Sequence, residues 1–327
     1  MQRFNVLAAL VLLAFVGSPA FAQSDAATFD GPRAFRVPEN VDARPVDIWS
    51  EGTRMAGTVY TPKATPKDKK LPTILMAHGW GGSAAALTRD AVGFAQAGYL
   101  VVSFDYRGWG QSDSRVILTK AAPADAQKNK GRFTAEVQEV REVVDPGDML
   151  VDWENALHWL HGEPQVDTSR IGIWGSSQSG GYVAEIATRD HRIKAVYSQV
   201  GAFSVHGMGD TPEARADATK RARGEIGYPE PGARVVGNLR GAPIRSKFAN
   251  YAPVDHMNDA GQVPIMIVIA ENEELFDNKD HGLLAYERYK GPKQLVTVPN
   301  IKHYGIYREA WPQAHKLALE WFDKHLK

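Results

Sequence analysis

Short apolar runs alternate with longer amphipathic stretches along most of this chain. Six of the runs are mostly apolar, which is typical of strands buried on both faces of a sheet. They cover residues 73–77, 100–104, 171–174, 193–199, 265–269 and 294–298. The stretches between them show helical periodicity over about 84–97, 147–161, 180–188, 278–289 and 310–325. This alternation predicts an α/β fold, with a mostly parallel central sheet and helices on both faces.

The remaining parts of the pattern are less regular. Residues 44–50 and 54–61 partly alternate between apolar and polar positions, so we expect an antiparallel pair of strands at one edge of the sheet. Residues 116–144 and 202–261 do not follow the strand–helix rhythm, and both are longer than a usual connection. We interpret the second of these stretches as a lid-like insertion over the carboxyl edge of the sheet, rather than as an independent domain.

The N-terminus has the pattern of an export signal. A short basic start precedes the apolar run Phe4–Val16, and Ala20-Phe21-Ala22 then places small residues where a signal peptidase cuts. The alternative is an uncleaved membrane anchor, but the apolar run is shorter than the roughly 20 residues that span a bilayer. We expect a signal peptide at 1–22, a tether at 23–39 and one main domain at 40–327. The mature protein would be periplasmic or secreted, without stable membrane insertion.

Composition excludes several classes of function. Lys and Arg together number 38, as do Asp and Glu, so the net charge is zero and no excess points to a nucleic-acid partner. The chain has no cysteine, which excludes disulfides, thiolate nucleophiles and Cys-bound metals. His158 and His161 share the spacing of one helix face, but no third ligand accompanies them. No glycine-rich phosphate or dinucleotide loop is present either, so we expect no cofactor and no metal.

The strongest chemical signal is a serine at a strand-to-helix turn. Residues 170–181 read RIGIWGSSQSGG, in which an apolar strand meets a small-residue turn and then a helix. Such a turn presents the serine hydroxyl at the sheet edge, near a helix N-terminus that favours negative charge. Ser177 has Gly175 two positions before it, as this pattern requires, but Ser179 stands where a second glycine is expected. Ser177 is the favoured nucleophile, and Ser179 stays open as the alternative.

A second loop has the composition of an anion-binding loop. Residues 76–83 read MAHGWGGS and follow an apolar strand. A His-Gly-x-Gly-Gly sequence at this place supplies one backbone N–H of an oxyanion hole, and the residue after the nucleophile supplies the other. We therefore expect the N–H groups of Trp80 and Gln178 to be the two donors. His78 is interpreted as a structural residue that supports the loop.

These two motifs and the segment 104–113 (FDYRGWGQSD) together resemble the α/β-hydrolase superfamily. Within it, the chain is similar to the branch of dienelactone-hydrolase-like and X-Pro-dipeptidyl-peptidase-like proteins, which includes bacterial esterases and fungal polyketide transferases. The resemblance covers about residues 40–327. It implies an α/β-hydrolase fold, and it assigns Asp105 and Arg107 to a structural turn. The motifs are specific to the fold and only weakly to the substrate.

The resemblance also implies the order nucleophile, acid, histidine along the chain. His303 follows the last predicted strand and precedes the final helix, so we expect it to be the general base. The acid should end the preceding strand, and a small residue with two spacers selects Glu273, with Asp277 as the runner-up. We do not expect Glu271 or Glu274 to contact the base.

The sequence thus predicts an exported serine hydrolase that cleaves a carboxylic ester or thioester bond of a small acyl substrate. It would form an acyl-enzyme on a triad of Ser177, His303 and Glu273. Two alternatives stay open. One is an acyltransferase that uses the same site with an alcohol or amine acceptor, and the other is a non-catalytic binding protein of hydrolase fold.

Overall fold

The computed structural model describes residues 35–236 and 239–327, and its centre is an eight-stranded sheet. The strand order is β1-β2-β4-β3-β8-β9-β13-β14. The bounds are β1 Val41–Ser50, β2 Thr53–Pro62, β3 Leu71–Ala77, β4 Leu100–Phe104, β8 Val166–Ser176, β9 Ile193–Gln199, β13 Ile265–Ala270 and β14 Lys293–Val298. All six predicted apolar runs are strands of this sheet. The predicted signal peptide, residues 1–22, lies outside the described residues.

The sheet is parallel from β4 to β14 and antiparallel at its first edge. β1 pairs with β2 and β2 pairs with β4 in antiparallel register, which confirms the predicted edge pair. β3, β4, β8, β9, β13 and β14 pair in parallel, so their carboxyl ends lie along one edge. Every residue of β3, β4 and β13 is buried, which explains why these strands are apolar on both faces.

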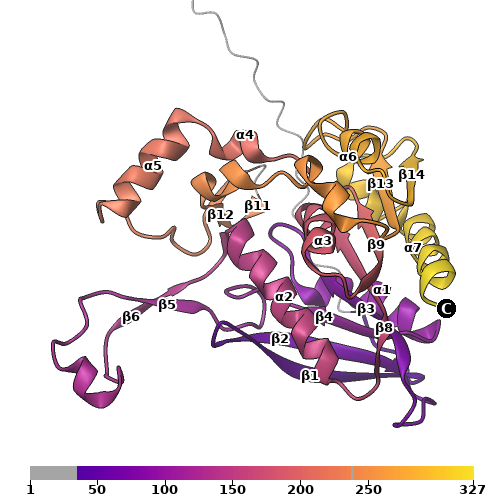
Figure 1. Cartoon of the computed structure of the whole chain (residues 1–327), viewed down its shortest axis with the longest axis horizontal. Coiled ribbons are helices and arrows are strands. Elements are labelled where there is room, and N and C mark those ends of the chain that lie inside the picture. The colour runs from indigo at the N-terminus through magenta and orange to yellow at the C-terminus, as the bar shows by residue number, and fades with distance from the viewer. Residues whose placement is uncertain (1–34, 237–238) are drawn as a thin grey trace, which may run out of the picture.

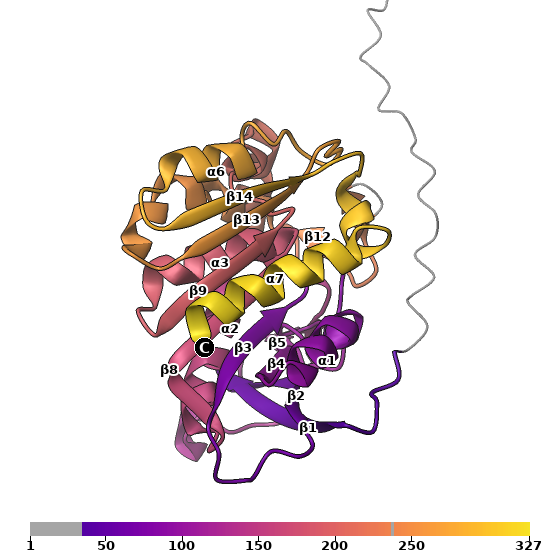
Figure 2. The ribbon, with the colours of Figure 1, turned by 90° about the vertical axis from the view of Figure 1, so that its right-hand side faces the viewer.

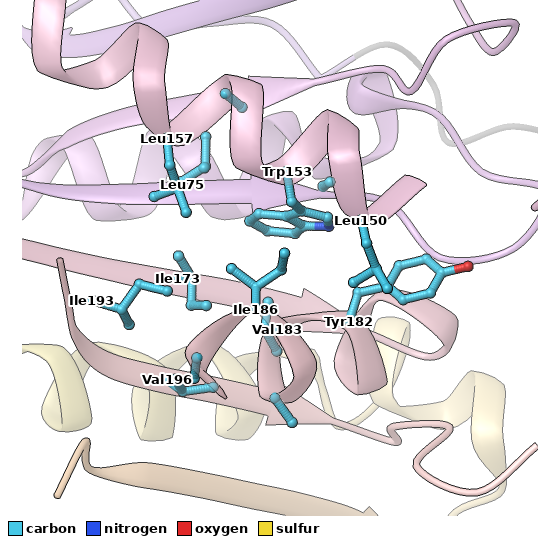
Figure 3. Close-up of a cluster of buried hydrophobic side chains, with 14 of the residues drawn as sticks. Leu75, Leu150, Trp153, Leu157, Ile173, Tyr182, Val183, Ile186, Ile193 and Val196 are labelled. Atoms are coloured by element: carbon cyan, nitrogen blue, oxygen red, sulfur yellow. The ribbon is translucent and has the colours of Figure 1, made fainter. Parts of the chain in front are cut away.

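Helices cover both faces of the sheet, as predicted. α2 (Pro146–Gly162), α3 (Gln178–Arg189) and α6 (Gly282–Arg288) pack on one face, while α1 (Thr88–Gln96) and α7 (Trp311–Leu326) pack on the other (Figure 2). Alternate strand residues feed the two cores: Leu75 belongs to the first and Ile74 to the second. Figure 3 shows Trp153 and Val183 from two helices of the first core, over the strand residues Leu75 and Ile173.

Two predicted helices begin later than the periodicity suggests. Residues 84–87 form a 3₁₀ helix, η1 (Ala84–Leu87), before α1. Residues 278–281 form turns before α6, since the Asn278 side chain donates to the carbonyl of Ala270 at 2.7 Å and the Asp277 carboxylate accepts from the N–H of Lys279 at 2.8 Å. These local side-chain hydrogen bonds stabilise a turn at residues 277–279, which competes with an earlier start of the helix. Within the described ranges, every helix is too short or too polar to cross a bilayer.

The two irregular stretches contain small elements that meet each other. The first holds β5 (Arg115–Leu118), η2 (Ala126–Asn129), β6 (Val137–Val140) and β7 (Val143–Val144). The second holds α4 (His206–Gly209), α5 (Pro212–Ala222), β10 (Arg234–Val236), β11 (Leu239–Arg240), β12 (Ala242–Pro243), η3 (Arg245–Asn250), η4 (Pro253–Asp255) and η5 (Met257–Ala260). β7 and β12 pair in parallel, which joins the two stretches. That 202–261 acts as a lid stays a prediction.

Candidate active site

Ser177 lies on a strained turn between a strand and a helix. β8 ends at Ser176 and α3 begins at Gln178, and Ser177 between them has φ 58° and ψ −126°. Non-glycine residues rarely adopt this region, and such strain is typical of functional turns. A Cβ atom on Gly175 would lie 2.2 Å from the carbonyl oxygen of Ser179, so the turn closes only around a glycine. The small residues of the motif therefore permit the backbone conformation that exposes the Ser177 side chain.

The geometry separates the two candidate serines. The Oγ of Ser177 lies 3.0 Å from the Nε2 of His303. Ser179 is fully buried in the first turn of α3, and its Oγ lies 3.2 Å from the hydroxyl of Tyr106. That hydroxyl also accepts a hydrogen bond from the indole of Trp153 at 2.9 Å. Ser179 is thus part of a buried polar cluster below the turn, while Ser177 contacts the predicted base.

His303 and Glu273 meet because β13 and β14 are parallel neighbours. Glu273 follows the end of β13 and His303 follows the end of β14, at the same edge of the sheet. The Nδ1 of His303 lies 2.9 and 2.8 Å from the two carboxylate oxygens of Glu273, and both side chains are 1% exposed. The runner-up acid, Asp277, instead caps the turn at Lys279. Ser177, His303 and Glu273 therefore form a continuous chain of hydrogen-bond contacts.

The structure overturns one expectation about the neighbouring glutamates. The carboxylate of Glu274 accepts a hydrogen bond from the backbone N–H of His303 at 2.7 Å, so it does contact the residue expected to be the base. Glu271 accepts from the backbone N–H of Asn300 at 2.7 Å. The contact was missed because it depends on a backbone group across two adjacent loops. The only signal in the sequence was the run of three glutamates within four residues.

Glu274→Ala is expected to lower kcat by about tenfold or more. Without the hydrogen bond from the His303 N–H to Glu274, the backbone at His303 is less well fixed, and the imidazole can move away from Ser177. Glu274→Gln keeps an acceptor for the same N–H and is expected to stay within about threefold of the wild type. Steady-state kinetics on a small ester checks both variants. Equal losses in the two variants, or a loss confined to KM, would contradict a role in positioning His303.

Aromatic rings surround the imidazole of His303. Phe276 and Tyr304 contact it edge-on, with ring centroids 5.7 and 5.3 Å away, and the ring of Tyr307 lies at 6.3 Å. The hydroxyl of Tyr307 lies 2.7 Å from the Oγ of Ser176. Burial raises the pKa of Tyr307, so its phenol stays neutral and links the end of β8 to the histidine loop. Sequence reasoning missed these rings, since nothing in their local pattern marks them.

The loop of residues 78–82 packs directly against the turn that carries Ser177. A Cβ atom on Gly79 would lie 2.8 Å from the carbonyl oxygen of Ser176 and 2.9 Å from the Cβ of Ser177, so only glycine fits there. Trp80 lies in this loop, and Gln178 is the first residue of α3, where the backbone N–H has no partner within the helix. That these two N–H groups form an oxyanion hole stays a prediction.

Residues of the second irregular stretch cover the same loop. The Trp80 ring stacks on Phe248 with centroids 5.9 Å apart, and its indole N–H donates to the carbonyl of Gly241 at 3.2 Å. A Cβ atom on Gly81 would lie 3.0 Å from the carbonyl oxygen of Arg240. These contacts hold the Trp80 side chain and the backbone at Gly81 against the second irregular stretch.

His78 lies behind this loop rather than in the site. Its side chain is buried, its Nδ1 lies 2.8 Å from the carbonyl oxygen of Gly79, and its ring packs edge-on against Tyr106 at 4.9 Å. Burial lowers the pKa of His78, so the ring is neutral. Its contacts fit the structural role inferred from the sequence.

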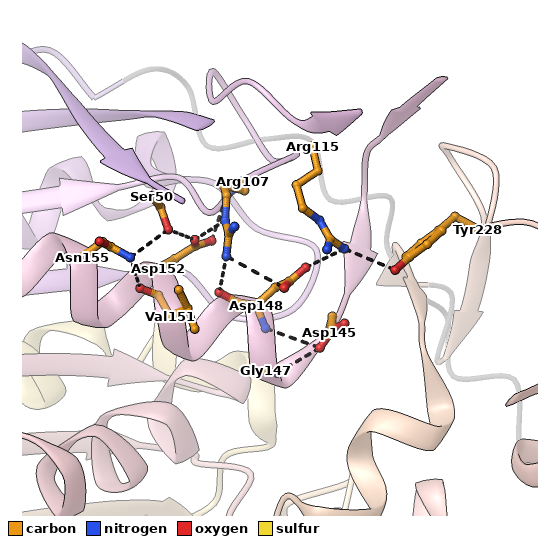
Figure 4. A network of polar contacts seen from close by, with 10 residues as sticks. All are labelled: Ser50, Arg107, Arg115, Asp145, Gly147, Asp148, Val151, Asp152, Asn155 and Tyr228. Carbon is orange, nitrogen blue, oxygen red and sulfur yellow. Dashed lines mark hydrogen bonds and ion pairs between the residues drawn. The ribbon is translucent and has the colours of Figure 1, made fainter. Parts of the chain in front are cut away.

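Asp105 and Arg107 also lie in structural contacts. The Asp105 carboxylate accepts hydrogen bonds from the backbone N–H groups of Ala84 and Gln111 at 2.6 and 2.9 Å. Arg107 pairs with the buried Asp152 of α2 (Figure 4). Burial raises the pKa of Asp152 to about 6. In the described part of the chain, no group of three or more potential ligands could bind a metal ion.

The sheet, the strained serine turn and the serine–histidine–carboxylate contacts together define an α/β hydrolase. Two family models match the chain: X-Pro dipeptidyl-peptidase (S15 family) over residues 51–211, and the C-terminal region of BAAT / acyl-CoA thioester hydrolase over residues 150–290. A hypothetical protein from Pseudomonas aeruginosa of known structure superposes with a TM-score of 0.71 at 18% identity, over 90% of this chain and 97% of its own. The chain thus has the α/β-hydrolase fold, and its sequence is similar to these two hydrolase families.

Three relatives extend this comparison. An uncharacterized 31.7 kDa protein of Escherichia coli is 25% identical over 83% of this chain and 96% of its own length. The quorum-quenching protein AidA of Acinetobacter baumannii is 30% identical over 49% of this chain and 45% of its own. The thiohydrolase aneE of Aspergillus aculeatus is 26% identical over 45% and 38%. The chain is accordingly a serine-hydrolase-like enzyme of the ester or thioester type.

Proposed function

We propose that this enzyme is an exported serine hydrolase that cleaves a carboxylic ester or thioester of a small acyl substrate, with Ser177 as its nucleophile. One observation carries the proposal. Ser177 Oγ, His303 Nε2, His303 Nδ1 and the Glu273 carboxylate follow one another within hydrogen-bond distance, on a turn whose strain exposes the serine. This is the arrangement that activates a hydroxyl for attack on a carbonyl carbon.

In the acylation step, the Nε2 of His303 takes the proton of Ser177 as the serine oxygen bonds to the carbonyl carbon. Glu273 accepts the N–H of Nδ1, which sets the tautomer and stabilises the imidazolium. The negative charge on the carbonyl oxygen is held by the N–H groups of Trp80 and Gln178. The bond to the alcohol or thiol then breaks, and that group takes the proton from His303. Water, deprotonated by His303, then attacks the acyl carbon. The bond from that carbon to Ser177 Oγ breaks, His303 returns the proton to the serine oxygen, and the acid is released.

A fluorophosphonate probe with mass analysis of the labelled peptide tests this proposal. We expect one covalent adduct, on Ser177, together with turnover of p-nitrophenyl esters or thioesters of suitable chain length. A folded protein that stays unlabelled and turns over no ester would favour a binding function. Added alcohols or amines that capture the acyl group faster than water would favour an acyltransferase.

Export is proposed from the N-terminal pattern alone. We expect that expression with the natural N-terminus in a bacterium gives an extracytoplasmic protein whose first residue is Gln23, because Ala20-Phe21-Ala22 closes a short apolar segment. N-terminal sequencing of the fractionated protein checks this. A chain that still begins at Met1, in the membrane fraction, would identify the segment as an anchor.

A further inference from the structure

A two-stranded ribbon projects from the body of the enzyme (Figure 1). We call it the arm; it comprises residues 115–140, with β5 and β6 paired in antiparallel register and η2 in the connection between them. Within the described ranges, these two strands form a sheet of their own. Isolated two-stranded ribbons are only marginally stable in water, so the arm depends for its stability on what its two faces contact.

The base of the arm is fixed to the body. Arg115 forms an ion pair with Asp148 of α2 at 2.7 Å and a hydrogen bond with the hydroxyl of Tyr228 at 3.4 Å (Figure 4). Ile117 and Val140 join a small apolar cluster with Val143 of β7, with Ile244 directly after β12, and with Tyr228. One face of the ribbon is therefore anchored, and the arm projects in a defined direction.

The opposite face of the ribbon is exposed, and three of its four strand side chains are apolar, the fourth being Glu139. Leu118 and Val137 are direct cross-strand partners and are 43% and 45% exposed. Val116, two residues before Leu118 and so on the same face, is 56% exposed, and Phe133 in the connection is 40% exposed. Four of the nine exposed large hydrophobic side chains in the described part of the chain thus lie on the arm. Such concentration marks an interaction surface rather than scattered surface residues.

Positive charge gathers beside this apolar face. Lys128, Lys130 and Arg132 are exposed, and none forms an ion pair with another described residue. The arm also carries Asp125, Glu136 and Glu139, of which Glu136 lies 3.9 Å from Lys120, so the three cations of the connection are only partly offset. The whole chain has zero net charge, so these cations are not part of a generally basic protein. Exposed lysines also lie at positions 67, 69 and 70, but there no exposed large hydrophobic residue accompanies them.

We propose that the arm docks on the surface of an anionic phospholipid bilayer. Its apolar side chains enter the boundary between headgroups and acyl chains, and its cations lie against the lipid phosphates. A second copy of this chain is the less fitting occupant, because the cores of protein interfaces are depleted in lysine while this surface is rich in it. The contact is peripheral and would hold the enzyme where apolar esters concentrate.

Vesicle flotation tests the proposal, with equal parts of phosphatidylglycerol and phosphatidylcholine compared with phosphatidylcholine alone. The protein starts at Gln23, because the apolar run 4–16 would bind lipid by itself, and this start keeps every described residue. We expect flotation with the anionic vesicles only, weakened by added salt because surface charges are screened. Binding to neither vesicle, or equally to both, would overturn the proposal.

Matched variants assign the binding to the arm. The triple change Lys128→Gln, Lys130→Gln and Arg132→Gln is expected to lower the affinity by about 100-fold, and Phe133→Ser by about tenfold. The control removes three exposed lysines from the turn before β3, through Lys67→Gln, Lys69→Gln and Lys70→Gln. That turn carries no exposed large hydrophobic residue among those described, so its loss should change the affinity little.

Three further readouts keep the outcome decisive. Hydrolysis of a soluble ester should be the same in all variants, which separates this proposal from the assignment of the active site. Equal loss of binding in the control variant would show non-specific attraction and overturn the role of the arm. Sedimentation velocity without lipid should give a monomer, and a dimer that Phe133→Ser dissociates would assign the arm to a second copy of the chain instead.

Discussion

Ser177→Ala is expected to lower kcat/KM for ester hydrolysis by about 10⁴- to 10⁶-fold and to abolish fluorophosphonate labelling. The loss is this large because nucleophile, base and acid act as a unit, and without the hydroxyl the remaining groups have nothing to activate. The residual rate would come from the oxyanion donors and from substrate binding alone. Stopped assays on purified protein measure the rate, and far-ultraviolet circular dichroism should show an unchanged fold.

Ser179→Ala is the matched control for the nucleophile. It removes a hydroxyl two residues away, in the same turn of the chain, whose contact is Tyr106 rather than His303. We expect most of the activity and full labelling to remain, with a cost in stability of about 1 kcal/mol from the lost buried hydrogen bond. If Ser179→Ala abolished labelling and Ser177→Ala did not, the nucleophile would be Ser179.

The second large effect is expected at the acid. Glu273→Gln should lower kcat/KM by at least about 10²-fold, because an amide beside the Nδ1 of His303 favours the tautomer that cannot accept the serine proton. An amide in place of the carboxylate costs about 10⁴-fold in serine proteases of the chymotrypsin type. We expect a smaller loss here, because two oxygens of Glu273 lie near Nδ1 and part of the orienting contact survives in the amide.

Asp277→Asn and Glu271→Gln are the controls for the acid. Asp277 accepts a hydrogen bond from the N–H of Lys279, and Glu271 accepts one from the N–H of Asn300; an amide oxygen can replace either. Each change should alter kcat/KM by less than about tenfold. A severe loss in Asp277→Asn beside a mild one in Glu273→Gln would mean that the acid reaches His303 from farther along the loop in the working enzyme.

The sequence by itself determined the sheet, its covering helices and the residues that meet at the edge. Strands buried on both faces are mostly apolar, as β3, β4 and β13 are, so the apolar runs could be recognised without tertiary information. The turn at Ser177 was equally readable, because its close backbone contacts demand Gly175 and other small residues. Neighbouring parallel strands end at the same edge of a sheet. Once the strands before Glu273 and His303 were recognised, the two residues could therefore be expected to lie close together.

Only the tertiary structure decided how that edge is held and what surrounds it. The contact of Glu274 with His303 joins a side chain to a backbone group 29 residues away, which no local pattern encodes. The two irregular stretches likewise take their form from pairing with each other, as β7 does with β12, rather than from their own periodicity. The arm escaped prediction for a related reason. A ribbon that buries only its base has no strong alternation of apolar and polar residues, and zero net charge over the whole chain conceals three unpaired cations in one place.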